Sequence, residues 1–291
     1  MVINIKNLTK TYNGKVQALK GVNIDIPEGL FGLIGRNGAG KTTLMRILTT
    51  VIKPSSGEIL FDGKDIFGNL EEFRGILGYL PQSTKLMPYL NIVEFLDYVG
   101  VLKGINDQKK RNDEIKRCIE TVGLTGEEKK RLAKYSGGML RRAGIAQALI
   151  GDPKLLIIDE PTVGLDPEER MYFLNLLSRI GEGKTIIFST HITHDIDNIC
   201  ENICILETGN VTYLGKKRLL IDSIRDKVWE CSVNPKEEEP IKQNATILSN
   251  VYLDGKSVIR YFSEKSIYEN STRTEPTLED AYIYSLGGLK R

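Results

Sequence analysis

The stretch Gly35-Arg36-Asn37-Gly38-Ala39-Gly40-Lys41-Thr42 decides the fold of this chain, because its glycines and its final Lys-Thr pair form a phosphate-binding pattern. Glycines let the backbone turn tightly around an anion, so that successive N–H groups point at phosphate oxygens. In this pattern the lysine reaches the β- and γ-phosphates, and the threonine hydroxyl binds Mg²⁺. The sequence therefore predicts a polyphosphate site at residues 35–42.

The segments around this loop predict an α/β fold. Leu30 to Ile34 is a short apolar run typical of a buried strand, and Thr43 to Leu48 has helical composition. A strand, a glycine-rich loop and a helix in this order indicate a doubly wound sheet. The stretch from Val2 to Ile26, interrupted by the turn residues Asn13 and Gly14, predicts antiparallel strands before the loop.

The remaining segments differ in their patterns of apolar and polar residues. Asp107 to Val122 has an apolar stripe at helical spacing, and another helix is expected after Gly138. The α/β pattern returns with a strand ending at Asp159, a helix over Pro167 to Ile180 and a strand over Thr185 to Ser189. Beyond about residue 215, alternating strands, a hairpin and a short helix predict a small α+β appendix, in which 237–240 is expected to be a solvated loop. The predicted domains are 1–214, with a helical subdomain at about 88–150, and 215–291.

Composition excludes several classes of protein. The 291 residues include 40 Lys and Arg and 38 Asp and Glu, so the net charge is +2, which argues against a nucleic-acid coat. No apolar run approaches the roughly 20 residues that a membrane helix needs. The four cysteines show no disulfide framework, and Met1 to Lys6 does not have the pattern of a signal peptide. We therefore expect a cytoplasmic protein without bound nucleic acid.

A second chemical motif follows an apolar strand, in which Leu155 to Ile158 lead directly to Asp159 and Glu160. A buried parallel strand delivers its last side chains to the sheet edge where the phosphate loop also lies. Asp159 is then placed to hold Mg²⁺, and Glu160 to act as the base for an attacking water or to orient it. Most adjacent acids are surface charge, but the phosphate loop favours the catalytic interpretation here.

A third motif, Tyr135-Ser136-Gly137-Gly138-Met139, begins a helix. Its small residues leave the N-terminal N–H groups exposed, and Ser136 adds a hydroxyl, so that this helix start can bind an anion. A plain N-cap followed by glycines is the alternative interpretation. One chain does not need two γ-phosphate sites for one nucleotide, so the combination suggests that two chains share each ATP.

The motifs together, in their order along the chain, resemble those of the ATP-binding subunit of ABC transporters over about residues 2–214. The residues that carry the resemblance are Tyr12, the loop 35–42, Gln82, Ser136-Gly137-Gly138, Asp159-Glu160, Gly164-Leu165-Asp166 and Ser189-Thr190-His191. The resemblance implies a P-loop NTPase core with an N-terminal antiparallel β subdomain and an inserted helical subdomain. It also implies an ATP hydrolase that uses Mg²⁺.

The resemblance implies a role for each of these residues. Tyr12 should stack on adenine, and Gln82 should touch Mg²⁺ or the attacking water. His191 should contact the γ-phosphate and hold the water and Glu160 in place, while Asp166 should lie across a dimer interface. The implied catalytic residues are Lys41, Gln82, Glu160 and His191, and the implied Mg²⁺ ligands are Thr42, Gln82 and Asp159. The implied nucleotide-binding residues are Tyr12, Gly35, Arg36, Asn37, Gly38, Ala39, Gly40, Lys41, Thr42, Thr43, Ser136, Gly137, Gly138 and Asp166.

Each of these side chains also has a structural interpretation. Taken alone, Tyr12 is a turn residue, Gln82 an exposed loop amide, His191 a structural histidine and Asp166 a helix cap before a proline. His194 matches no family motif, and two histidines alone do not make a zinc site. The signature also departs from the family, since Tyr135 and Met139 stand where leucine and glutamine are usual, which puts pairing preference in doubt.

The implied mechanism needs partners. Two copies, or one copy and a second ATPase subunit, would sandwich two ATP molecules head to tail, and a separate membrane permease would use the motion. The segment from Pro88 to Gly104 is the candidate docking surface. The ending from Glu275 to Tyr282 resembles ATPases of bacterial drug and peptide-antibiotic exporters, so we expect export, with the chain held at the inner face of the membrane by its permease.

Other classes that share this core fit less well. DNA-repair and chromosome ATPases insert a long coiled coil before the signature, and no heptad run is present here. Translation-factor ATPases carry two cores in one chain, and small-molecule kinases lack the Ser136 signature and His191. A non-transport ABC-type ATPase, or a regulatory binding module disabled by Met139, stays open as the alternative.

Overall fold

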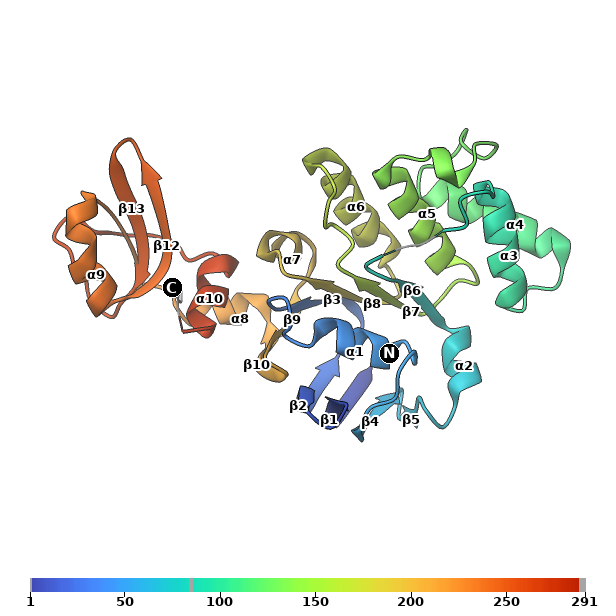
Figure 1. The fold of residues 1–291 in the computed structure, drawn as a ribbon, viewed down its shortest axis with the longest axis horizontal. Coiled ribbons are helices and arrows are strands. Elements are labelled where there is room, and N and C mark those ends of the chain that lie inside the picture. The colour runs from blue at the N-terminus through green and yellow to red at the C-terminus, as the bar shows by residue number, and fades with distance from the viewer. Residues whose placement is uncertain (1, 84–85, 288–291) are drawn as a thin grey trace.

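A six-stranded sheet forms the centre of the computed structural model, which describes residues 2–83 and 86–287 (Figure 1). Its strand order is β10-β9-β3-β8-β7-β6. The bounds are β3 Gly29–Ile34, β6 Leu77–Leu80, β7 Leu155–Asp159, β8 Thr185–Thr190, β9 Asn202–Glu207 and β10 Asn210–Lys216. All neighbours are parallel except β9 and β10, which form a hairpin. The strands β7 and β8 are buried along their whole length, as a sheet covered on both faces requires.

A second sheet, antiparallel and in the order β2-β1-β4-β5, covers one face of the central sheet. Its strands are β1 Ile3–Tyr12, β2 Val16–Ile26, β4 Ser56–Phe61 and β5 Lys64–Asp65. The β1–β2 turn places Asn13 and Gly14 at φ values of 49° and 67°, the left-handed conformation that these residue types tolerate best. Between the two sheets lies α1 (Lys41–Leu48), whose apolar side chains join one continuous core with both.

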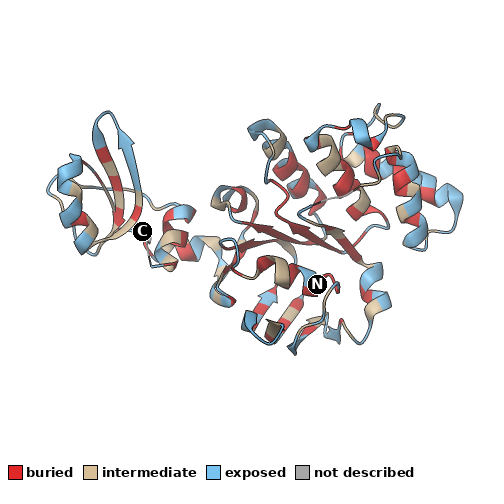
Figure 2. Ribbon diagram, in the orientation of Figure 1, coloured by how far each residue is buried: buried red, intermediate tan, exposed pale blue. Residues whose placement is uncertain are grey.

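Helices cover the other face of the central sheet (Figure 2). They include α6 Pro167–Ile180, α7 Thr193–Ile199, and the helices of the inserted region, α3 Ile92–Leu102, α4 Gln108–Thr121 and α5 Gly137–Leu149. Side chains of Asn91, Asp107 and Ser136 cap the N-termini of α3, α4 and α5. A short helix, α2 (Leu70–Gly75), precedes β6 on the side of the antiparallel sheet.

The C-terminal region forms a separate four-stranded sheet in the order β12-β13-β11-β14. Its strands are β11 Val228–Val233, β12 Thr246–Leu253, β13 Lys256–Phe262 and β14 Thr272–Arg273, and its helices are α8 Lys217–Asp222, α9 Glu238–Asn244 and α10 Leu278–Ser285. The sheet and α9 enclose a small core of their own. By contrast, α8 and α10 contribute to the main core, and α10 packs against α7.

The α/β fold class with a P-loop core and antiparallel subdomain is confirmed, but one local prediction is wrong. The acidic stretch at 237–240 is not a solvated loop, because Glu238 begins α9 after a 3₁₀ turn over Pro235–Glu237. Acids in a first helical turn are stabilised by the helix dipole, and Pro240 lies where no N–H is needed. Within the described residues, no helix is both long and apolar enough to span a membrane.

Candidate active site

The phosphate loop joins β3 to α1 and is held closely by neighbouring backbone. A Cβ at Gly35 would lie 2.4 Å from the carbonyl oxygen of Leu206, and a Cβ at Gly40 would lie 2.6 Å from that of Ala18. Gly40 also has a φ of 108°, which other residues rarely adopt. Only glycine therefore fits at both positions, and the loop is fixed between β2 and β9.

The amine of Lys41 lies inside this loop. Its Nζ donates hydrogen bonds to the carbonyl oxygens of Gly35 at 2.6 Å and Arg36 at 3.2 Å, and it lies 3.1 Å from Oε1 of Glu160. The two side chains are only 4% and 6% exposed. Desolvation offsets much of the attraction in a buried ion pair, so stability alone does not explain it. The pair places the cation between the phosphate loop and the end of β7, where anionic oxygens of a nucleotide would enter.

Asp159, the last residue of β7, is buried with two hydroxyls beside it. The Oγ of Ser189 donates to its Oδ1 at 2.6 Å. Burial raises the pKa of the Asp159 carboxyl, and the hydroxyls of Ser189 and Thr42 oppose this shift. A buried carboxylate next to a threonine hydroxyl is a donor set suited to a hard divalent cation, which would also favour its ionised form.

Glu160 is held in an unusual backbone conformation by β8. Its φ is 44°, and its N–H donates to both the carbonyl oxygen and the Oγ of Ser189 at 3.1 Å. A left-handed backbone costs a non-glycine residue about 1–3 kcal/mol, and such strain concentrates at functional sites. In this conformation Oε1 of the carboxylate lies 3.1 Å from Nζ of Lys41.

His191 completes this group from the end of β8. Its Nδ1 lies 3.2 Å from Oε2 of Glu160, and its side chain is 39% exposed. Glu160 therefore bridges the amine of Lys41 on one oxygen and the imidazole of His191 on the other. The structure brings Lys41, Asp159, Glu160 and His191 together at one edge of the central sheet, next to the phosphate loop.

Tyr12 and Thr43 lie beside the same loop. The Tyr12 hydroxyl is 3.4 Å from Oγ1 of Thr43 on α1, and Nζ of Lys10 lies 5.4 Å from the centre of the Tyr12 ring. The ring thus stands next to α1 and is half-buried. This place is compatible with the predicted contact to a base bound at the loop.

The signature residues are arranged differently. Ser136 caps α5 by accepting a hydrogen bond from the Met139 N–H at 3.2 Å, and both Ser136 and Gly137 are exposed. Gly138 is buried, and a Cβ there would lie 2.4 Å from Cδ of Glu169. Asp166, also exposed, caps α6 by accepting from the Glu169 N–H at 2.9 Å. Among the described residues, no hydrogen bond or ion pair joins Ser136 or Asp166 to the phosphate loop.

Gln82 follows β6 in an exposed position, and its carbonyl oxygen accepts a hydrogen bond from Nη1 of Arg141 at 2.9 Å. Sequence reasoning missed this arginine, and it named Ser189 only within the motif Ser189-Thr190-His191 without giving it a role. A further signal for the contacts of Ser189 is its place on a strand parallel to β7. For Arg141 there was no signal, since its partner is 59 residues away.

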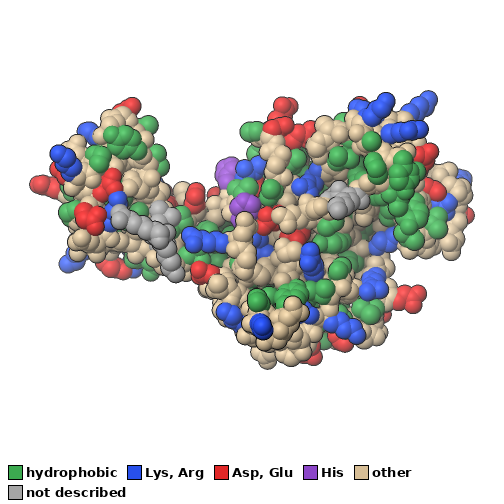
Figure 3. Space-filling view, in the orientation of Figure 1, with side chains coloured by type: hydrophobic (Ala, Val, Ile, Leu, Met, Phe, Trp, Pro, Cys, Tyr) green, Lys and Arg blue, Asp and Glu red, His purple; other side chains and the backbone are tan. Residues whose placement is uncertain are grey.

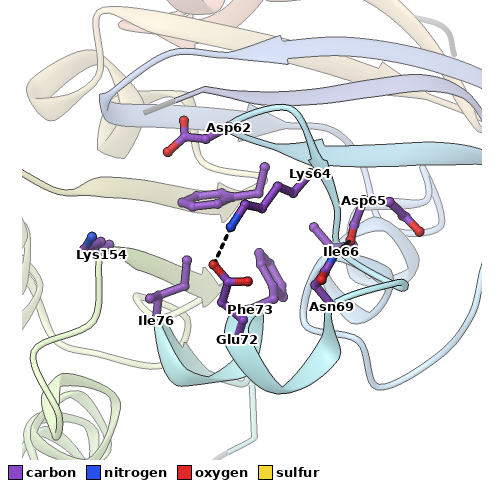
Figure 4. Close-up of a pocket in the computed structure, with 10 residues that line it drawn as sticks. Asp62, Lys64, Asp65, Ile66, Asn69, Glu72, Phe73, Ile76 and Lys154 are labelled. Atoms are coloured by element: carbon purple, nitrogen blue, oxygen red, sulfur yellow. Dashed lines mark hydrogen bonds and ion pairs between the residues drawn. The ribbon is translucent and has the colours of Figure 1, made fainter.

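A cavity of about 160 Å³ lies elsewhere, between α2 and the β4–β5 hairpin (Figure 4). Phe61, Ile66 and Phe73 form its apolar part, and Lys64 and Glu72 make an ion pair of 2.7 Å across it. No predicted site residue lines this cavity.

Comparison with known proteins places these features in context. The family model described as ABC transporter matches residues 19–163. An uncharacterized ABC transporter ATP-binding protein of Bacillus subtilis, YxlF, is 33% identical, covering 86% of this chain and 83% of its own. The Nod factor export ATP-binding protein I of Cupriavidus metallidurans is also 33% identical, covering 90% of this chain and 87% of its own.

Two further matches concern direction and assembly. The methionine import ATP-binding protein MetN of Geobacillus kaustophilus is 36% identical and covers 74% of this chain and 66% of its own. Among solved structures, the dimeric post-hydrolysis state of the ATP-binding cassette MJ0796, bound to ADP and Pi, has a TM-score of 0.67 at 28% identity. The alignment covers 74% of this chain and 98% of the MJ0796 chain.

Proposed function

Because the chain belongs to the family of ABC transporter ATP-binding proteins and is an ATP hydrolase, we propose that it works as a dimer that drives export through a separate permease. The single observation that carries the catalytic part of the proposal is that the buried Glu160 carboxylate contacts both Lys41 and the half-exposed His191, next to Asp159 in the chain. This group is what a phosphate loop needs in order to turn nucleotide binding into hydrolysis.

The proposed chemistry divides between these side chains. Lys41 and the loop N–H groups would bind the β- and γ-phosphates, and Thr42, Asp159 and Gln82 would hold Mg²⁺, which when bound would supply positive charge beside the leaving phosphoryl group. Glu160 accepts the proton of the attacking water or orients that water, and the His191 imidazole holds Glu160 and contacts the γ-phosphate. Nucleotide entry would take Lys41 from Glu160 to the phosphates and free the carboxylate for water.

The proposed dimer completes the site from outside. Ser136, Gly137 and the first turn of α5 would present N–H groups and a hydroxyl to the γ-phosphate bound by the other protomer. Asp166 would lie across the interface. The exposure of Ser136 and Gly137 supports this arrangement, because anion-binding groups on the surface have no nucleotide to meet within their own chain.

The proposed permease contact is the surface of α3 and the residues before it. Apolar side chains gather there (Figure 3). The exposed ones in this segment are Tyr89, Val93, Tyr98, Val101 and Leu102. An apolar patch of this kind marks an interaction site in a protein that is otherwise polar at its surface.

Export, rather than import, is proposed from the ending Glu275 to Tyr282, which resembles that of exporter ATPases. The alignment with the Nod factor export protein covers 90% of this chain and so includes part of the C-terminal appendix. The alignments with MetN and with the linearmycin resistance protein LnrL of Bacillus subtilis each cover 74%, about the length of the ATPase core alone. The substrate class proposed from this pattern is a drug, peptide or lipid-like molecule.

Substitution of Glu160 tests the catalytic proposal. In Glu160→Gln the carbonyl and amide keep the shape of the side chain but remove the base, so kcat should fall about a thousandfold while ATP affinity stays within a few-fold. Steady-state hydrolysis and ATP binding measure the two quantities. Glu182→Gln, an exposed change in the α6–β8 turn, is the control. Wild-type turnover in Glu160→Gln would remove Glu160 from this role.

Membrane capture tests the permease proposal. Leu102 is 68% exposed on α3, and Val16 is 64% exposed on β2. Tagged wild-type protein should retain one integral-membrane protein from detergent-solubilised membranes, Leu102→Asp should lose it, and Val16→Asp should keep it. Equal retention by all three would contradict docking through α3.

A further inference from the structure

Arg141 lies on the face of α5 that carries the exposed signature glycine. Gly137 and Arg141 are four positions apart in the helix, so they share one face. Both line a groove of about 200 Å³, together with Gln82 and the loop 163–165 that leads to Asp166. The groove therefore joins the signature, the glutamine loop and the interface loop.

One hydrogen bond crosses this groove. Nη1 of Arg141 donates to the carbonyl oxygen of Gln82 at 2.9 Å, and the two residues are 59 positions apart. A backbone carbonyl is fixed to the peptide plane, so the contact orients the peptide that follows Gln82. It thereby restricts the directions open to the exposed Gln82 side chain.

The chain keeps a positive charge in an unfavourable place to make this contact. Burial lowers the pKa of the Arg141 guanidinium, and no carboxylate of the described residues opposes that shift. The neighbouring Arg142, by contrast, lies 3.6 Å from the carboxylate of Glu169. A neutral carbonyl compensates the desolvation of a cation less well than a carboxylate does. The hydrogen bond to the Gln82 carbonyl, rather than an ion pair, is therefore the contact that holds the Arg141 guanidinium in this groove.

We infer that Arg141 is a positioning residue for ATP hydrolysis, which holds the Gln82 loop against the signature helix. The inference rests on the proposed function, since it assumes that Gln82 acts beside Mg²⁺ and the attacking water. Arg141 touches neither of them and acts through Gln82. Because α5 presents Ser136 and Gly137 to the ATP of the other protomer, the bond also links the two nucleotide sites of the dimer.

Removal of the donor tests the inference. Arg141→Met keeps an unbranched side chain but has neither charge nor N–H. Its kcat should fall about tenfold and its Mg²⁺ requirement should rise several-fold, as for other residues that orient metal-site groups. KM for ATP should stay within about twofold. Arg141→Lys, which keeps a donor and a charge, should recover most of the rate. A wild-type kcat and Mg²⁺ dependence in Arg141→Met would overturn the inference.

A double-mutant cycle separates positioning from general stability. If Arg141 acts through Gln82, Arg141→Met should not lower kcat further in the Gln82→Ala background. An equal loss of kcat in the wild-type and Gln82→Ala backgrounds would overturn the inference. Thermal unfolding identifies any variant that does not fold. If Arg141→Met fails to fold, the cycle is run with Arg141→Ala, which also removes the guanidinium and is a good helix former. A folded Ala variant whose loss of kcat is equal with and without Gln82 would equally overturn the inference.

Arg179 offers a matched control. Its Nη2 donates to the carbonyl oxygen of Thr121 at 2.8 Å, so it also joins the helical region to the rest of the chain through an arginine–carbonyl bond. It lies at the other end of α6 from Asp166. Arg179→Met should leave the Mg²⁺ dependence unchanged, and the same rise there would overturn the inference. All assays use the chain without a permease. The ATPase results therefore test the role of Arg141 even if the docking proposal fails.

Discussion

The two halves of the proposed nucleotide site are built in opposite ways. On the phosphate-loop side, Lys41 and Glu160 are almost fully buried and contact each other. On the signature side, Ser136, Gly137 and Asp166 are exposed, and the two polar side chains only cap their own helices. Folding of one chain thus fixes the first half, whereas the second half ends at the surface. The fold of one chain therefore positions the side chains of the phosphate-loop half, and association of two chains would complete the nucleotide site.

On the exposed half, the largest expected effect comes from an added charge. A Cβ at Gly137 would meet no atom within 4 Å, so Gly137→Glu should fold normally, and an acid at a helix N-terminus is itself stabilising. In the dimer its carboxylate would repel the γ-phosphate of the other protomer, so kcat should fall about a hundredfold. ATPase assays and thermal unfolding measure both effects. Full activity in Gly137→Glu would mean that this surface meets no nucleotide, and Gly137→Ala is the milder control.

The next effect is on stability, at a contact between the loop after β7 and the helix after His191. Asp195 is fully buried, and its carboxylate accepts from Oγ1 of Thr162 at 2.6 Å and from Nε of Arg170 at 2.5 Å. Asp195→Ala leaves both donors unpaired, so the free energy of unfolding should fall by about 2–3 kcal/mol. Urea denaturation measures it. Asp195→Asn, which keeps an acceptor, should lower the free energy of unfolding by less. An unchanged urea midpoint in Asp195→Ala would show that these two contacts do not stabilise the fold.

A smaller effect concerns the buried metal-side carboxylate. Because burial raises the pKa of Asp159, its ionisation costs stability in the folded protein. The folded state binds the proton more readily, so stability falls as pH rises above about 4, through the folded pKa. Without Mg²⁺, Asp159→Asn should be more stable than wild type near pH 7 and equal to it in acid, while losing hydrolysis. A pH-independent difference in urea denaturation would contradict this cause.

The smallest effect is expected at the unusual signature residue. Met139 contributes its backbone N–H to the Ser136 cap, and this bond does not depend on the side chain. Met139→Gln should therefore change the dimer dissociation constant by no more than about threefold, the worth of a single exposed hydrogen bond. The constant is measured by sedimentation with Mg-ATP in the Glu160→Gln background. A change of a hundredfold would show that Met139 sets the pairing.

Local patterns predicted those parts of the site that are continuous in sequence. The phosphate loop, the helix over Pro167–Ile180 and the strand that ends at Asp159 all appear where the sequence indicated. Each depends on periodicity, on caps or on glycine conformations, which neighbouring residues determine. The loop expected at 237–240 was wrong because an acidic, proline-containing segment also suits a first helical turn.

Contacts between distant segments were not predictable in the same way. The two bonds from the Glu160 N–H to Ser189, and the bond from Arg141 to Gln82, join residues 29 and 59 positions apart. Such contacts depend on the order of strands and on how helices pack, which one sequence does not specify. The roles of Tyr12, Gln82, His191 and Asp166 came from family resemblance, and they stay predictions.

Sedimentation of Glu160→Gln is the most direct test of a nucleotide site shared by two chains. With hydrolysis blocked, the protein should be monomeric without nucleotide and dimeric with Mg-ATP, and addition of Gly137→Glu should return it to a monomer. A Glu160→Gln protein that binds Mg-ATP but stays monomeric at every concentration would contradict the shared site.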